Sequence, residues 1–61
     1  MSNVYKENGY NSRREYLLEL ADTYGLDTFT VFSIAEVLGE SEDFDGLISA
    51  LEDAEAMGLG L

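Results

Sequence analysis

The positions of the glycines limit the fold of this proline-free chain more than any other sequence feature. Gly25, Gly39 and Gly58 each follow a run of apolar residues that recur with a helical period. Because glycine readily adopts the left-handed conformation that ends many helices, each of these residues is expected just beyond a helix C-terminus. The sequence therefore predicts an all-α domain of three helices over residues 10–58, between a loose N-terminal segment at 1–9 and a tail at 59–61.

The first helix has both a start signal and a stop signal. Ser12 and Glu15 have the S-x-x-E spacing of a capping box, in which each side chain accepts a hydrogen bond from a backbone N–H near the other residue. The helix is expected to open at Ser12 and to end at Gly25. Its apolar stripe consists of Tyr16, Leu17, Leu20, Ala21 and Tyr24.

Two further helices are expected after the first glycine. Asp27 or Thr28 supplies a capping oxygen for the second helix, which should run to Leu38. This helix is apolar on most of its circumference, so either it is central or a partner covers its second side. The third helix is expected to begin within residues 42–46, where acidic side chains favour the positive end of the helix dipole. Its inward-facing residues are Phe44, Leu47, Ile48, Leu51 and Ala54.

Residues 17–38 have the spacing of a helix-turn-helix. A small Ala21 lies where two helices would cross, and Gly25 follows four residues later at the turn. In that family the second helix reads DNA with Arg, Lys, Asn or Gln placed against the base edges. The outward positions of the second helix here carry no basic residue; they are Asp27, Thr28, Phe29, Thr30, Phe32 and Ser33. We therefore expect the helical arrangement without the DNA-binding activity.

The distribution of charge points to a cationic partner. Lys6, Arg13 and Arg14 are the only cationic side chains, whereas all but one of the 13 Asp and Glu residues follow Arg14. The formal net charge is −10. Nucleic-acid binding depends on Lys and Arg that neutralise phosphates, so direct binding to nucleic acid is not expected. A basic surface of another protein is the expected partner.

Catalysis and cofactor binding have little support in the sequence. The chain has no His and no Cys, which removes disulfides and the usual zinc ligands. Three short helices seldom enclose the concave pocket that an active site needs. Neither a secretory leader nor an apolar run of about 20 residues is present, so no membrane association is expected. We expect a cytoplasmic protein that is not an enzyme and holds no cofactor.

Residues 41–52 resemble the calcium loop of EF-hand proteins. In that resemblance Asp43 and Asp45 would be ligands and Glu52 would be the bidentate last ligand. Ser41 stands where the first Asp ligand is usual, and no second loop is present to pair with this one. Helix capping explains the same acids without a metal, so weak calcium binding is the alternative interpretation.

Carboxylates and exposed aromatic residues form the predicted binding surface. The acids crowd into a short stretch and are joined by Glu52, Asp53 and Glu55 on the outer face of the third helix, so one side of the domain should be strongly negative. Outward-facing aromatic residues make good interface anchors. The predicted surface consists of Phe29, Phe32, Glu36, Glu40, Glu42, Asp43, Asp45 and Glu52. We interpret it as a site for a basic protein; a purely solubilising surface, or a structural domain that self-associates as a homodimer, are the alternatives.

The stretch from Gly9 to Glu55 carries a resemblance to other proteins, and two segments carry most of it. Gly9–Leu17, with the sequence GYNSRREYL, and Glu42–Leu47, with EDFDGL, look like short uncharacterised acidic proteins carried by phages and conjugative elements of Gram-positive gut bacteria. The resemblance implies a bacterial mobile-element setting and an inhibitor of a host or rival system. It implies no functional residue.

Overall fold

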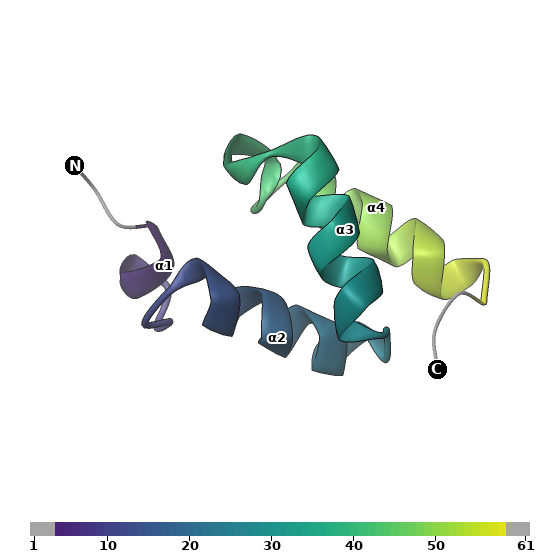
Figure 1. Cartoon of the computed structure of the whole chain (residues 1–61), viewed down its shortest axis with the longest axis horizontal. Coiled ribbons are helices and arrows are strands. Elements are labelled where there is room, and N and C mark those ends of the chain that lie inside the picture. Colours follow the sequence, from purple (N-terminus) through teal and green to yellow (C-terminus); the bar gives the residue numbers. More distant parts are fainter. Residues whose placement is uncertain (1–3, 59–61) are drawn as a thin grey trace.

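A computed structural model describes residues 4–58, and every regular element within them is helical. The predicted all-α class is therefore confirmed. The three longer helices are those expected from the glycine positions, and α3 crosses α2 steeply (Figure 1). The elements in chain order are α1 (Val4–Glu7), α2 (Arg13–Tyr24), α3 (Thr28–Leu38), the 3-10 turn η1 (Glu40–Glu42) and α4 (Gly46–Ala56).

The start of α2 follows its predicted cap with one difference. The Ser12 hydroxyl accepts a hydrogen bond from the Glu15 backbone N–H at 3.3 Å, as expected for an N-cap. The Glu15 carboxylate reaches one residue further back than a capping box requires. It accepts from the backbone N–H and from the side-chain amide of Asn11, each at 3.2 Å. The first turn of α2 is thus tied to the segment that precedes it.

The end of α2 is set by Gly25, as the sequence predicts. Gly25 has φ 64° and ψ 34°, the left-handed conformation that a β-carbon disfavours. The next residue, Leu26, donates its N–H to the Ala21 carbonyl at 2.9 Å, which is the 6→1 bond of a Schellman motif. Leu26 is buried, so this turn directs the chain back over the core and into α3.

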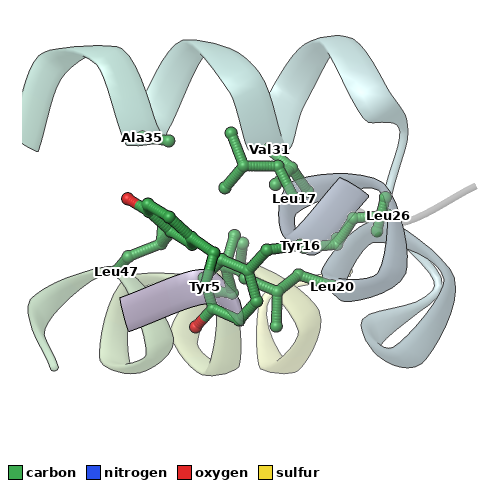
Figure 2. Close-up of a cluster of buried hydrophobic side chains, with 11 residues drawn as sticks. Tyr5, Tyr16, Leu17, Leu20, Leu26, Val31, Ala35 and Leu47 are labelled. Atoms are coloured by element: carbon green, nitrogen blue, oxygen red, sulfur yellow. The ribbon is translucent and has the colours of Figure 1, made fainter. Parts of the chain in front are cut away.

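The core lies where α2, α3 and α4 meet. Figure 2 shows Val31 and Ala35 on α3 directed toward Leu47 on α4, and all three side chains are fully buried. α3 packs against both α2 and α4, which agrees with the central position expected from its composition. The other core residues of these three helices are Tyr16, Leu17, Leu20, Ala21, Leu51 and Ala54.

The N-terminal segment differs from the prediction. The sequence suggests a loose segment over residues 1–9, but Val4–Glu7 form α1 and the Tyr5 side chain is buried in the core. The loose description is wrong for this part of the segment because Tyr5 has a long-range partner that no local pattern reveals. Residues 1–3 and the expected tail at 59–61 lie outside the described residues.

The approach to α4 also differs from the prediction in detail. The helix begins at Gly46, within the expected range, but Asp45 at its N-cap position makes no side-chain cap hydrogen bond. Phe44 precedes the helix and is 40% exposed, so its expected inward position on α4 is wrong. Asp43 does not cap α4 either, because its side chain turns into the protein.

Candidate functional site

Asp43 is the polar centre of the domain. Its side chain is 0% exposed, although it stands among acids that were expected at the surface. The carboxylate accepts two hydrogen bonds from the Arg13 guanidinium, Nε to Oδ2 at 2.7 Å and Nη2 to Oδ1 at 3.0 Å. The Tyr5 hydroxyl donates a third hydrogen bond to Oδ2 at 2.5 Å. A buried carboxylate requires compensation of this kind, and here a cation and a phenol provide it.

Side chains of α2 also bind backbone carbonyls of two other segments. The Tyr16 hydroxyl, from α2, donates to the Asp43 carbonyl at 2.7 Å. Arg13 Nη2 also donates to the Ala35 carbonyl on α3 at 3.1 Å. Within residues 4–58 no buried side-chain nitrogen or oxygen lacks a hydrogen-bond partner. The network therefore satisfies the polar groups that the fold buries.

Aromatic rings surround this ion pair. The rings of Tyr16 and Phe44 are stacked, with centroids 4.4 Å apart and an interplanar angle of 15°. Tyr5 packs at 5.8 Å from both of them. Tyr10 meets Tyr16 edge-on at 5.0 Å. Phe44 packs against Tyr16 and Tyr5 on one side, and its other side faces solvent.

Tyr5, Tyr16 and Arg13 have shifted pKa values with clear causes. Burial, followed by the hydrogen bond to Asp43, raises the pKa of the Tyr5 phenol above its ordinary value. Burial, followed by the negative charge of Asp43, raises the pKa of Tyr16 to about 12. The hydrogen bond to Asp43 raises the pKa of Arg13. The two phenols stay neutral and the guanidinium stays charged throughout the physiological pH range.

The acids predicted for the binding surface do not share one environment. Glu36, Glu40, Asp45 and Glu52 are exposed, as the prediction requires. Glu42 is half-buried, and its carboxylate lies so close to Gly46 that a β-carbon there would be 2.5 Å from Glu42 Oε1. Asp43 differs from all of them because it is buried and paired, so its predicted place on an open acidic surface is wrong.

The alternative calcium site is not assembled. Its three proposed ligands were Asp43, Asp45 and Glu52, and Asp43 already compensates Arg13. In the part of the chain that the structure describes, no group of three or more carboxylates is placed to hold a metal ion. The Asp45 and Glu52 side chains are exposed and lie outside the buried Asp43 site.

The two predicted aromatic anchors lie on the outer side of the α2–α3 pair. Phe29 is 76% exposed, and Phe32 is half-buried beside it. With Leu18 they line a shallow, open depression of about 320 Å³, whose other lining residues are Arg14 and Thr28. The Arg14 guanidinium carbon lies 5.9 Å from the centroid of the Phe32 ring, within range of a cation–π contact. We call these five residues the Phe29 surface.

A second depression continues the Phe29 surface toward the turn between the two helices. The two depressions share Leu18 and Thr28, and the second is also lined by Asp22 and Leu26. The apolar surface is therefore bordered by Arg14 at one end and by Asp22 at the other. Sequence reasoning identified Phe29 and Phe32 but not Leu18 or Arg14, because these lie on the preceding helix and their position depends on how the two helices cross.

Within the described residues no helix is long and apolar enough to cross a membrane. Comparisons of the chain with protein-family models, with curated proteins and with solved structures find no match.

Proposed function

We propose that this chain is a small acidic interaction module that binds a basic protein partner and performs no catalysis itself. The observation that carries the proposal is the exposure of Phe29. A phenylalanine that is 76% exposed leaves most of its apolar surface in water, and here it adjoins two further apolar side chains, Phe32 and Leu18. Aromatic residues in such clusters are typical anchors of protein interfaces.

The charge of the chain supports a cationic partner. Arg13 is committed to Asp43, so the 12 other acids face only Lys6 and Arg14 as cationic side chains. Glu36 follows Phe32 by four residues on α3, which places the two on neighbouring positions of one helical face. A negative field around an apolar anchor accelerates encounter with a positive surface and disfavours anionic competitors.

The same charge opposes the self-associating alternative. Two copies that each carry a net charge of −10 repel one another, and this repulsion is strongest at low salt. An inhibitor or regulator of a basic protein is the form of the proposal that agrees with charge, size and the exposed aromatic anchor. The proposed bacterial mobile-element setting and cytoplasmic location rest on the sequence alone, the setting on the resemblance of Gly9–Leu17 and Glu42–Leu47. Nucleic acid is proposed as a competitor for the partner and not as a ligand of this chain.

Affinity capture from a bacterial lysate tests the proposal. The bait is the tagged full chain, and the variants are Phe29→Ser and, as a matched control, Val37→Ser, which changes a side chain on the same helix that is 85% exposed. We expect a basic protein to be captured at low salt by the parent chain and by Val37→Ser, and to be lost with Phe29→Ser. Capture that is equal with all three baits, or no capture of a basic protein, contradicts the proposal.

A further inference from the structure

The short helix α1 buries one side chain in the domain. Tyr5 is the buried residue of α1, whereas Val4, Lys6 and Glu7 are exposed. A helix of four residues has no stability of its own, because nucleation of a helical turn is unfavourable. The local hydrogen bond from the Tyr10 N–H to the Tyr5 carbonyl, 2.8 Å, shapes the segment but does not join it to α3 or α4. Tyr5 is therefore the buried anchor of α1 in the domain.

The site that receives Tyr5 is held together by contacts that do not involve α1. Arg13 fixes the Asp43 carboxylate with two hydrogen bonds, and the Tyr16 hydroxyl fixes the Asp43 backbone carbonyl. Phe44 stacks on Tyr16, and the two rings together form one aromatic wall. A phenol that packs against this wall, as Tyr5 does with its centroid 5.8 Å from each ring, meets an oriented carboxylate acceptor at its hydroxyl end. Aromatic rings beside one convergent polar group are features of a small-ligand site.

We propose that Asp43, Arg13, Tyr16 and Phe44 form a phenol-recognition site, which α1 occupies as a tethered ligand through Tyr5 and which takes a tyrosyl side chain of another chain when α1 detaches. This goes beyond the proposed function, because the site lies apart from the Phe29 surface and its contacts share no residue with that surface. An intramolecular ligand on a short tether has a high effective concentration, so a competitor gains access only when α1 opens.

The chemistry of the site defines its selectivity. A ligand without a hydroxyl leaves the third hydrogen bond of Asp43 unmade, and loss of a hydrogen bond to a buried charged group weakens binding. A phosphorylated tyrosine is rejected, because its negative charge would face the Asp43 carboxylate, with the Glu40 carboxylate also 3.5 Å from the Tyr5 hydroxyl. The ligand class is therefore a neutral phenol.

Chemical rescue of the full chain with Tyr5→Ala tests the proposal. The probes are p-cresol, which has the ring and hydroxyl of tyrosine, and toluene, which lacks the hydroxyl. We expect p-cresol to raise the melting temperature of Tyr5→Ala in a saturable way, to bind roughly tenfold more tightly than toluene, and to leave the parent chain almost unaffected. Equal effects of the two probes, or equal effects on the parent and the variant, overturn the proposal.

Hydrogen exchange of Tyr5→Phe keeps the test decisive if Tyr5→Ala does not fold. This variant retains the ring and removes the hydroxyl, with its hydrogen bond to Asp43 and its longer one to Glu40. If α1 opens by itself, the Tyr10 amide should exchange roughly tenfold faster than in the parent, while the Gly39 amide, bonded to the Ala35 carbonyl, accelerates much less. An equal acceleration of both amides shows that α1 opens only with the whole domain and overturns the proposal.

Discussion

Arg13 and Asp43, 30 residues apart in the chain, form a bidentate ion pair in which the carboxylate is completely buried. The pair joins the start of α2 to the turn before α4. It also divides the acids of this chain into two groups. Asp43 is a structural residue, whereas Glu36, Glu40, Asp45 and Glu52 remain exposed and available to a partner.

Asp43→Asn is expected to destabilise the domain by about 3 kcal/mol, because the partly buried Arg13 guanidinium loses its counter-ion and the buried site loses a charged hydrogen-bond acceptor. Domains of this size have only a few kcal/mol of total stability, so the variant should be largely unfolded at room temperature. Asp45→Asn removes the same charge two residues away, at an exposed side chain without a cap hydrogen bond, and should change stability by less than about 0.5 kcal/mol. Urea unfolding followed by circular dichroism measures both. Equal losses in the two variants contradict the structural role of Asp43.

The features that sequence reasoning predicted correctly are local ones. The Ser12 cap, the stop at Gly25 and the run of α3 to Leu38 depend on residues within a few positions of one another, so their spacing is visible in the sequence. Gly25 is the clearest example, since a helix followed by a left-handed glycine needs no tertiary information.

The features that were missed depend on partners distant in the chain. Nothing near Asp43 distinguishes it from Asp45, and only the packing of α2 against the turn before α4 brings Arg13 to it. The sequence places Tyr5 in a loose segment for the same reason, since its partner lies 38 residues away. One sequence signal limits the choice of the cation. The chain has three cationic side chains for 13 acids, so only three residues could supply the positive member of a buried ion pair.

Gly25→Ala is expected to destabilise the domain by about 1–2 kcal/mol, because alanine is strained at φ 64° even though a β-carbon there meets no atom within 4 Å. Gly25→Asn is the matched control, because asparagine tolerates the left-handed region. This variant should lose less stability than Gly25→Ala. Denaturant midpoints of the two variants provide the comparison. A loss with asparagine as large as that with alanine would show that the conformation of Gly25 is not the cause.

Alkaline pH should destabilise the protein through its two buried phenols. The folded-state pKa values of Tyr5 and Tyr16 are raised, that of Tyr16 to about 12, so folding favours the neutral phenols. Their contribution is fully present below the unfolded pKa of about 10 and is lost as pH rises through the folded values, with a limiting slope of about 1.4 kcal/mol per pH unit for each phenol. Unfolding free energies measured between pH 8 and pH 11 should fall less steeply in Tyr5→Phe than in the parent. Identical slopes would place Tyr5 outside the buried network.

Moderate salt should stabilise the domain at neutral pH. The exposed carboxylates repel one another, and a Debye length of about 8 Å at 0.15 M screens that repulsion. The buried Arg13–Asp43 pair is screened much less, so the net effect should be a rise in melting temperature of roughly 5 °C between 10 mM and 150 mM salt, equivalent to about 1 kcal/mol for a domain of this size. Thermal melts at constant pH measure the change. A fall in melting temperature would mean that exposed ion pairs, and not repulsion, dominate the surface.

Amide chemical-shift mapping with the captured basic protein is the most direct measurement of the proposed interaction. Titration of that protein into the isotopically labelled chain should shift the amides of Leu18, Phe29, Phe32 and Glu36 in a saturable way at low salt, and Phe29→Ser should abolish the shifts without unfolding the domain. Shifts confined to α1 and α4, with the Phe29 surface unaffected, would contradict the account.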